Sequence, residues 1–496
     1  MGMVLNTNIG AIQAQRALTN SRKEMEQAME RLATGSRING AADDAAGLAM
    51  VERMNSQIRG LTMATRNAND GIALIKTVEN ALVEVSGMLQ RMRELAVQSA
   101  SDTNTASERA FANNEFNQRP LDFSRVSLNT RYNGAQVLNG SFSAKALQIG
   151  TESGESLEFS IGNIESSQLG AYVIDGTNTV AVAGNSGVNP TNAATAAQDV
   201  TITSGTLTRV IDVELNDTAK QVAKKINSVA GSTQVVGEAR TYAWLFTSTA
   251  SPTDSGKLNI NGTETAAFTI TSNDVTDAVS KINAITSATG VQATSTGDYK
   301  ILLSDSDGDD IVITNISDRA DLKVQSLAID SLTPIAVDGS DVITLADGNP
   351  AATGDTVNVR GNLRLSSTTD FSVTQANSAS YFANGLTSSP LVDISSVDVL
   401  TRITASNSLA VLDGAISRTS SMRGSLGTLQ NRLDYTVSNL MKVTEFTTGA
   451  RSRIADADFA AETSRLAKAQ VLQQAGAAML SQANASTDVI LQLLRT

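Results

Sequence analysis

Apolar residues recur at alternating steps of three and four residues near both ends of this 496-residue chain. Such spacing lines the apolar side chains along one side of a helix, in a stripe whose narrow width is close to the coiled-coil period of about 3.5 residues. We therefore expect long helices that pack through these stripes. The stripe on the N-terminal side contains Val78, Leu82, Val85, Leu89, Met92 and Ala96, and the one on the C-terminal side contains Leu412, Ile416, Leu426, Leu429, Leu433, Val437 and Leu440.

A second pair of stripes lies closer to the two chain ends. A narrow apolar stripe does not stabilise a lone helix in water, so each of these segments needs a partner. We expect them to pair with each other or with neighbouring copies, and to become ordered on assembly because they are chain ends rich in small and polar residues. A plain helical bundle would explain the stripes equally well. The N-terminal stripe consists of Leu18, Met25, Met29 and Leu32, and the C-terminal one of Leu466, Ala469, Leu472, Ala475, Met479 and Ala483.

Between roughly residues 175 and 400 the pattern changes to short alternating runs rich in Thr, Ser, Asp, Asn, Gly and Val, which predict strands. Within this zone Asn216-Asp217 leads to Lys225-Ile226-Asn227, and about 56 residues further on Asn273-Asp274 leads to Lys281-Ile282-Asn283. Each stretch predicts a short amphipathic helix that the Asn-Asp pair caps, followed by a strand. Two similar α+β units are the simplest account of this repeat.

The length predicts two to four domains, and the residue types that are missing narrow the chemistry. The chain has no His and no Cys. This removes the commonest general base and metal ligand, as well as thiolate nucleophiles, zinc-thiolate sites and disulfides. Aromatic residues make up only 4%, so the core must be aliphatic, which helix packing allows. The net charge of −12 argues against nucleic-acid binding. We expect a structural protein without a cofactor or metal, not an enzyme.

The first residues carry no targeting signal that these rules detect. Residues 1–6 lack the basic region and long apolar run of a secretory signal peptide, and Asn6 stands where a myristoylation signal needs Ser or Thr. No stretch approaches about 18 uninterrupted apolar residues, so we expect no membrane insertion. By these rules alone the protein would be cytosolic.

Three polar segments invite a site interpretation. The acidic run at 305–310 lacks the glycine and glutamate positions of a helical calcium loop, and its apolar flanks predict a hairpin turn instead. Segment 39–47 lacks the Lys-Ser/Thr of a phosphate loop, so we interpret Asp43 and Asp44 as acidic residues at the positive end of a helix dipole. The charged cluster at 91–94 interrupts an apolar stripe, and is either a solvated helix face or a surface that a partner recognises.

Asn-Gly pairs at 133–134, 139–140 and 261–262 predict hairpin turns.

Taken together, the end segments resemble bacterial flagellins. The resemblance covers about residues 1–145 and 400–496, and the middle zone matches only in kind, since its paired units look like a repeat often inserted in flagellins. The matching motifs on the N-terminal side are LNTN (5–8), ERLATGSRIN (30–39), DDAAG (43–47), RNANDG (66–71) and LQRMRELAVQ (89–98), and those on the C-terminal side are ARSRIADADF (450–459), QVLQQAG (470–476) and LLR (493–495).

The resemblance implies an α+β multidomain fold with paired terminal coiled-coil helices, a helical rod domain with a β-hairpin, and β-rich outer domains inserted in the middle. Residues 1–45 with 455–496 would form the inner coiled-coil domain of a filament. Residues 46–175 with 400–454 would form the rod domain, which makes most subunit contacts. Residues 176–399 would form a variable outer region, with two α+β repeat units at about 200–255 and 256–330 and a further β-rich part.

The implied function is that of a structural subunit that polymerises into the bacterial flagellar filament for swimming motility. A head-to-tail interface that does not close into a ring gives an open helical filament, and ends that fold only in the lattice keep free subunits soluble. Flagellins leave the cell through a type III export channel, so the missing signal peptide is expected and the localisation becomes extracellular. The implied partners are further copies of the chain, an export chaperone and the export apparatus, hook-associated and cap proteins, and toll-like receptor 5.

The resemblance also assigns residues. The polymerisation helices would use Leu18, Met25, Met29, Leu32, Leu466, Leu472 and Met479, and receptor recognition would use Gln90, Arg91, Leu95 and Glu115. Pro120 departs from the family pattern, which usually has an apolar helix former there. Because proline inside a helix costs about 3 kcal/mol and kinks it, we expect the helix around Glu115 to break at this position.

Three alternatives remain at this point. A hook–filament junction protein has similar terminal helices, although the density of flagellin motifs disfavours it. The middle zone could act as a displayed binding module such as an adhesin. An enzymatic insertion of the zinc-protease type requires His-Glu-x-x-His, which a chain without His excludes.

Overall fold

The computed structural model describes residues 8–176, 181–185, 190–191, 199–250, 255–296, 298–317, 319–329, 342–346, 353–375, 381–382 and 385–494. The chain forms two compact units. Unit 1 contains the described parts of Met1–Lys76, Ala144–Phe159 and Gly427–Thr496, and unit 2 contains those of Thr77–Ser143 and Ser160–Leu426. The described terminal motif residues are therefore Asn8 at one end and Leu493 and Leu494 at the other, while 5–7 and 495 lie outside the described residues.

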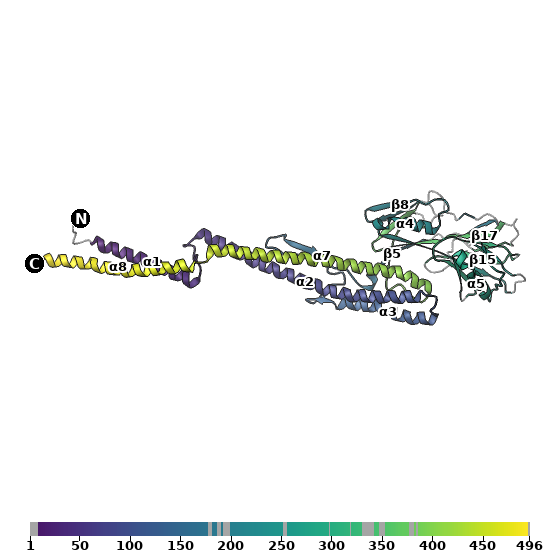
Figure 1. The fold of residues 1–496 in the computed structure, drawn as a ribbon, viewed down its shortest axis with the longest axis horizontal. Coiled ribbons are helices and arrows are strands. Elements are labelled where there is room, and N and C mark those ends of the chain that lie inside the picture. Colours follow the sequence, from purple (N-terminus) through teal and green to yellow (C-terminus); the bar gives the residue numbers. More distant parts are fainter. Residues whose placement is uncertain are drawn as a thin grey trace. The chain divides into compact units, whose positions relative to one another are not determined.

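In unit 1, helix α1 (Ile9–Thr34) lies beside helix α8 (Phe459–Leu494), as Figure 1 shows. The side chain of Asn8 caps α1 by accepting the Ala11 N–H, and its amide donates to the Ala483 carbonyl of α8 at 2.9 Å. Gly35 ends α1 with a left-handed φ of 70°, a conformation that glycine adopts without steric cost. The expected pairing of the two chain ends is confirmed.

Unit 1 also holds the first part of α2 (Ala45–Ser99), the last part of α7 (Arg402–Ala455) and a hairpin of β3 (Lys145–Gln148) and β4 (Ser156–Phe159). Asn67 of α2 donates to the Gln148 carbonyl at 3.0 Å. At Gly71 a Cβ atom would lie 2.7 Å from Leu147 Cδ2, so the absence of a side chain lets the hairpin approach the helix. The Asn-Gly signals did not predict this second hairpin.

In unit 2, the rest of α2 packs with α3 (Ala106–Asn129) and the first part of α7, and the three helices run side by side in Figure 1. The whole predicted stripe of α2 from Val78 to Ala96 is buried, which confirms the helical periodicity. Thr105 and Glu108 form a capping box that begins α3.

Two of the three Asn-Gly predictions hold. Asn133 and Gly134, with φ of 49° and 82°, connect β1 (Arg131–Tyr132) to β2 (Ala135–Gln136). Asn261-Gly262 connects β10 (Leu258–Ile260) to β11 (Thr263–Glu264) in the same way. The prediction at Asn139-Gly140 was wrong. Gly140 has a φ of 80°, but it forms a bend that joins no pair of adjacent strands.

The expected break at Pro120 was also wrong, because α3 continues through it to Asn129. Pro120 is buried on the same face as Phe116 and Phe123, which lie four residues before it and three after it. Burial of this face offsets the hydrogen bond that proline cannot donate to the Phe116 carbonyl. Tertiary packing thus overrides the local helix penalty of proline here.

The β-rich part of unit 2 contains three larger sheets among the described residues. Two hydrophobic cores lie there: one surrounds helix α4 (Ala219–Thr233), and the other surrounds α5 (Thr276–Asn283), which is followed by the short α6 (Thr286–Thr289). The 3-10 helix η1 (Ser166–Gln168) precedes strand β5 (Gly170–Asp175). With these elements the predicted α+β fold class, long paired helices with a β-rich middle, is confirmed.

The strands pair antiparallel throughout these sheets. The eight-stranded sheet has the order β12-β13-β9-β18-β5-β21, with β15 on β9 and β16 on β15; the five-stranded one has β11-β10-β14-β17-β6, and the four-stranded one β20-β19-β7-β8. The bounds are β5 Gly170–Asp175, β6 Ala181–Asn185, β7 Val200–Ser204, β8 Leu207–Ile211, β9 Val235–Thr247, β10 Leu258–Ile260, β11 Thr263–Glu264, β12 Val291–Ser295, β13 Ile301–Asp305, β14 Ile311–Asn315, β15 Leu322–Ser326, β16 Val342–Thr344, β17 Thr353–Val359, β18 Asn362–Ser367, β19 Phe371–Gln375, β20 Gly385–Ser388 and β21 Leu391–Asp393.

The same side-chain hydrogen bonds recur at positions 56 residues apart in α4–β9 and α5–β12. Asn227 donates to the Gly237 carbonyl and accepts its N–H, both at 2.8 Å. Asn283 does the same with Ala293, at 2.9 and 2.8 Å. Each asparagine therefore joins a helix to the next strand along the chain.

The predicted Asn-Asp caps need correction. Thr218, not Asn216-Asp217, caps α4 in a capping box with Gln221. Asp217 instead accepts a hydrogen bond from Lys225 at 2.7 Å. In the second unit, the Asp274 carboxylate accepts the Thr276 N–H, although Val275 is the capping position. For α4, the Thr218 hydroxyl followed three residues later by Gln221 was a stronger signal for the helix start than the Asn-Asp pair.

The acidic run at 305–310 is a turn, but the hairpin prediction was wrong, since β13 and β14 lie in different sheets. The buried carboxylate of Asp305 accepts the N–H groups of Asp307 and Gly308, and burial raises its pKa. Lys220 bonds Asp307 and Asp309 at 3.1 and 2.7 Å. Throughout the described part of the chain no acidic cluster of metal-binding geometry occurs.

Candidate assembly and recognition surfaces

The terminal helix pair is close-packed along its middle. Leu18 of α1 lies over Gly476 of α8, where a Cβ atom would be 3.5 Å from Leu18 Cδ1. Ala28 and Ala469 are buried in the same interface. Small residues thus let the two backbones approach closely, but they bury little apolar area, so the pair gains little stability from its own core.

The seven predicted polymerisation residues divide into two groups. Leu18, Met25, Leu32 and Leu466 are half-buried in the pair, whereas Met29, Leu472 and Met479 are 44%, 43% and 65% exposed. The predicted stripe of α8 leaves the packed face at Leu472, Ala475 and Met479 and returns to it at Ala483. Between these positions the packed face continues through Gln473, Gly476 and Leu480. Polar and small residues on the buried side hid this face from a search for large apolar residues.

A polar cluster joins the two helices near the end of α1. Arg31 Nη1 donates to Glu462 Oε1 at 3.2 Å, and the side chains are only 15% and 6% exposed. Arg465 Nη1 donates to the other oxygen of Glu462, also at 3.2 Å. Asp43 lies 3.9 Å from Arg31, and its pKa is lowered chiefly by the Asn39 backbone N–H.

Beside this cluster, the segment that follows α1 forms hydrogen bonds with the end of α7 and with the residues just after it. The Arg37 N–H donates to the Ala455 carbonyl at 2.6 Å, and the Ala457 N–H donates to the Gly35 carbonyl at 2.9 Å. The Arg37 guanidinium adds two bonds to the Ile454 carbonyl, at 2.7 and 3.1 Å. We call this set of contacts, at 35–37 and 454–457, the joint.

The predicted recognition residues are brought together on unit 2 by α2 and α3. Arg91 donates to both carboxylate oxygens of Glu115, at 2.9 and 3.1 Å, and to Glu94 at 2.9 Å. Arg119 donates to Glu115 at 3.0 Å. Arg91 and then Arg119 lower the pKa of Glu115 to about 2, and Glu115 in turn raises the pKa of Arg91.

The two remaining recognition residues differ in exposure. Gln90 is exposed beside Arg91, but Leu95 is only 2% exposed. Leu95 is thus buried in the single chain, and its part in recognition stays a prediction. Leu95 faces the core because it follows Leu89 and Met92 along the packed side of α2.

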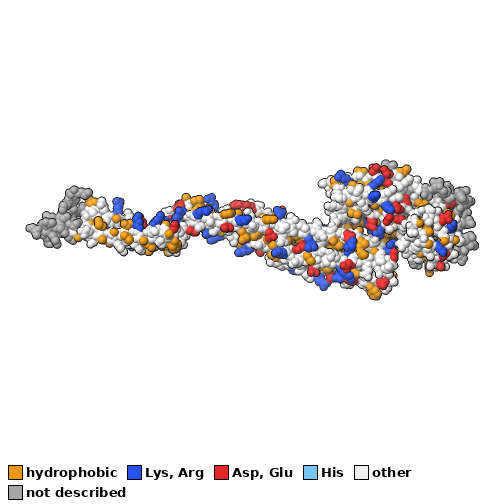
Figure 2. Space-filling model, in the orientation of Figure 1, with side chains coloured by type: hydrophobic (Ala, Val, Ile, Leu, Met, Phe, Trp, Pro, Cys, Tyr) orange, Lys and Arg blue, Asp and Glu red, His pale blue; other side chains and the backbone are white. Residues whose placement is uncertain are grey.

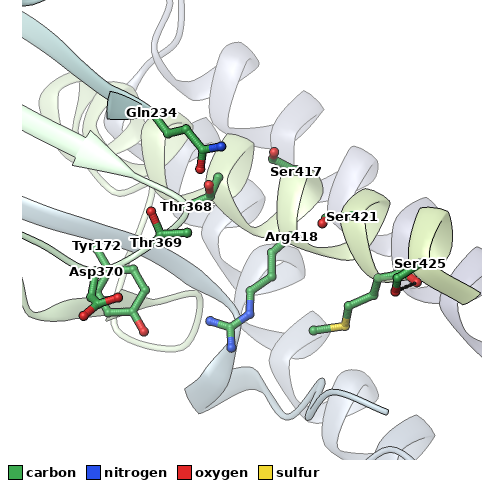
Figure 3. Close-up of a pocket in the computed structure, with 10 residues that line it drawn as sticks. Tyr172, Gln234, Thr368, Thr369, Asp370, Ser417, Arg418, Ser421 and Ser425 are labelled. Atoms are coloured by element: carbon green, nitrogen blue, oxygen red, sulfur yellow. Dashed lines mark hydrogen bonds between the residues drawn. The ribbon is translucent and has the colours of Figure 1, made fainter. Parts of the chain in front are cut away.

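A polar hollow of about 720 Å³ opens in unit 2 between α7 and the turn that joins β18 to β19. Arg418 extends from α7 into it, and serines at steps of four line the same helix, as Figure 3 shows. The hollow is open and hydroxyl-rich, unlike the enclosed apolar cavities that bind most cofactors. It is lined by Tyr172, Gln234, Thr368, Thr369, Asp370, Ser417, Arg418, Ser421, Met422 and Ser425.

Comparison with known proteins connects these surfaces to a family. The profile for the bacterial flagellin N-terminal helical region matches residues 5–143, and the profile for the C-terminal helical region matches residues 409–494. The B-type flagellin of Pseudomonas aeruginosa is 35% identical over 505 residues, with all of both chains covered. The chain belongs to the bacterial flagellin family.

Other flagellins match over their full length as well. Flagellin B of Vibrio cholerae is 31% identical over 494 residues, and the flagellin of Salmonella typhimurium is 32% identical over 524 residues, in each case with 100% of both chains covered. The alignments therefore span the middle zone as well as the two profile matches.

Membership in the family settles the general function. This flagellin is a structural, non-enzymatic subunit that polymerises into the extracellular flagellar filament used for motility. No helix in the part that the structure describes is long and apolar enough to cross a membrane.

This flagellin also exposes apolar side chains that sequence reasoning missed. Tyr435, Met441 and Phe446 of α7 are all well over half exposed. Figure 2 shows further hydrophobic side chains at the surface of the helical segments. Where exposed apolar residues form a contiguous patch, that patch marks a surface that binds other proteins. Their helical spacing gave no signal, because they lie outside the buried stripe.

Proposed function

We propose that this flagellin assembles through its terminal helix pair, in which one group of residues holds the pair together and another contacts neighbouring subunits. Leu18, Met25, Leu32 and Leu466 would form the first group, because they are half-buried between α1 and α8. Met29, Leu472 and Met479 would form the second. Their exposure on a helix pair with a thin core is the observation that carries the proposal.

The proposal divides the chain into three layers. Residues 1–45 with 455–496 would form the inner domain, residues 46–175 with 400–454 the rod domain, and residues 176–399 the outer region. The helix ends at Thr34 and Ala455 support the first boundary. The recurring Asn227 and Asn283 contacts support two outer units at about 200–255 and 256–330.

Electron microscopy after salting-out tests the proposal, with the full chain beside a version trimmed to residues 46–454. We expect filaments from the full chain and none from the trimmed one. Met479→Lys should also block growth, whereas Leu386→Lys, at an equally exposed leucine of β20, should not. A full chain that stays monomeric in the presence of filament seeds would overturn the proposal and favour the hook–filament junction alternative.

For export, we infer that the flagellar type III system secretes the chain with the help of a chaperone, and that hook-associated and cap proteins contact the growing filament. The support is the family membership and the absence of cysteine, which suits passage of an unfolded chain. A secretion assay with residues 1–45 deleted should leave the protein inside a cell that exports the full chain. Export of the deleted protein would contradict this inference.

For recognition, we infer that monomers bind toll-like receptor 5 through Gln90, Arg91 and Glu115, with Leu95 holding α2 in place beneath them. The bidentate Arg91–Glu115 pair supports this, because it fixes exposed hydrogen-bonding groups on two helices. In a receptor reporter assay Arg91→Ala should lower potency. Arg93→Ala is the matched control, since Arg93 is equally exposed and pairs with Asp413. Full potency of Arg91→Ala would refute the assignment.

A further inference from the structure

We propose that the Arg31–Glu462 ion pair sets the register between α1 and α8, and thereby positions the terminal helix pair for filament assembly. The pair is nearly desolvated. Such pairs often contribute little net stability, and fixing a register is their best-supported role. A contact that fixes the register is needed here because large and small side chains repeat regularly along both helices.

Both helices repeat large and small residues every seven positions. On α1 the larger Leu18, Met25 and Leu32 alternate with a row of small residues, Ala14, Ser21 and Ala28. On α8 the small row contains Ala469, Gly476 and Ala483, and the larger row contains Leu466, Gln473 and Leu480. All of these side chains are buried or half-buried in the structure.

Leu18 over Gly476 shows how the rows fit, with a large residue on a small one. Because the pattern repeats, a slip of seven residues would move Leu18 from Gly476 to Ala469. A large side chain of α1 would then still pack on a small residue of α8. The slip displaces one helix by about 10 Å, at a rise of about 1.5 Å per residue. Apolar packing alone therefore distinguishes the two registers weakly.

Glu462 breaks this repetition. It continues the small row of α8 seven residues before Ala469, yet it is acidic and its side chain is only 6% exposed. In the observed register it meets Arg31 at 3.2 Å. After the slip, the position of Arg31 would be taken by Glu24, which lies seven residues earlier. A buried carboxylate would then face a like charge, which strongly disfavours the slipped register.

The joint is the other feature that resists a slip. Two of its four hydrogen bonds join backbone groups and so do not depend on which side chains are present, and the other two join the Arg37 guanidinium to the Ile454 carbonyl. A substitution at Arg37 therefore separates the contribution of the joint from that of the ion pair.

Disulfide trapping in filaments measures the register, because the natural chain has no cysteine. Leu18→Cys with Gly476→Cys reports the observed register, and Leu18→Cys with Ala469→Cys reports the slip. A bond within one subunit keeps the monomer mass on a non-reducing gel, which distinguishes it from a bond between subunits.

With Arg31→Met and Glu462→Leu added, the slipped disulfide should increase about tenfold relative to the native one, which corresponds to about 1.4 kcal/mol of register preference. Arg31→Lys should keep the native ratio. Arg22→Met with Glu26→Leu, an exposed pair on the same helix, should also leave the ratio unchanged.

An unchanged ratio in the apolar double variant would overturn the proposal. So would a slip produced by Arg37→Ala alone, since that outcome would assign the register to the joint. If the double variant does not enter filaments even together with excess unmodified subunits, Glu462→Gln replaces it as the test. An increase in the slipped product then supports the proposal, and no increase refutes it.

Discussion

Arg91 and Glu115 lie on different helices, and the guanidinium of the first donates to both carboxylate oxygens of the second. The pair is solvent-exposed, so it adds little to stability. Its physical effect is geometric. It holds α2 and α3 in a fixed relation at the surface and keeps the Glu115 carboxylate ionised.

The first prediction concerns the titration of Glu115. Its pKa in the folded chain is about 2, against an ordinary value of 4.5. A lowered pKa means that the stabilising contribution is present above pH 4.5 and is lost as the pH falls toward 2. Arg91→Ala should raise the pKa toward the ordinary value, although Arg119 will still lower it. Carboxyl NMR of the trimmed monomer measures the shift, and an unchanged pKa in Arg91→Ala would contradict the prediction.

The second prediction concerns Pro120, which lies inside α3 without ending it. Pro120→Ala restores an N–H for the Phe116 carbonyl and removes a helix penalty of about 3 kcal/mol, but it leaves a small cavity on a buried face that costs about 1–2 kcal/mol. We expect a net stabilisation of about 1–2 kcal/mol. Thermal or denaturant unfolding of the monomer checks this. A loss of stability would show that the neighbouring phenylalanines depend on the proline ring.

The long helices and the pairing of the chain ends were predictable because they follow from local periodicity. What the pattern could not supply is which distant groups meet. Arg31 and Glu462 are 431 residues apart, and no spacing rule joins them. The same limitation explains the wrong hairpin prediction at 305–310. The apolar flanks of this turn predict two strands, but they do not show that β13 and β14 belong to different sheets.

The recognition cluster was predictable only through family resemblance. Spacing alone left Arg91 as either a solvated or a recognised residue, and Leu95 was included because it belongs to the same motif. The structure separates them by exposure, since α2 turns Leu95 toward the core. Pro120 shows the opposite limitation, where a reliable local rule gave the wrong result because burial of a helix face outweighed it.

The third prediction tests the two matched asparagines of the outer region. Asn227→Ala and Asn283→Ala each remove one donor and one acceptor to the following strand. Each should lower the free energy of unfolding by about 2 kcal/mol, because the backbone groups of a part-buried strand lose their partners. Hydrogen exchange at the Gly237 and Ala293 amides should accelerate in the corresponding variant. Asn273→Ala, at an exposed turn position, is the control and should change neither. Equal exchange rates in all three variants would contradict the prediction that Asn227 and Asn283 each hold the following strand.

The fourth prediction uses two glycines of the same helix, α7, with opposite surroundings. At Gly414 a Cβ atom would lie 2.7 Å from the Cβ of Ala171 and 3.0 Å from the Gly170 carbonyl oxygen, and neither atom belongs to a flexible side-chain end. Gly427 has nothing within 4 Å. Alanine is the better helix former by about 1 kcal/mol at either site.

Gly427→Ala should therefore stabilise the monomer by about 1 kcal/mol, whereas Gly414→Ala should destabilise it by about 1–3 kcal/mol because α7 must move away from β5. Denaturant unfolding of the two variants under identical conditions gives the signs directly. If both substitutions stabilise the chain, the helix can shift away from β5 without loss, and the close approach at Gly414 is not needed to hold α7 against the sheet.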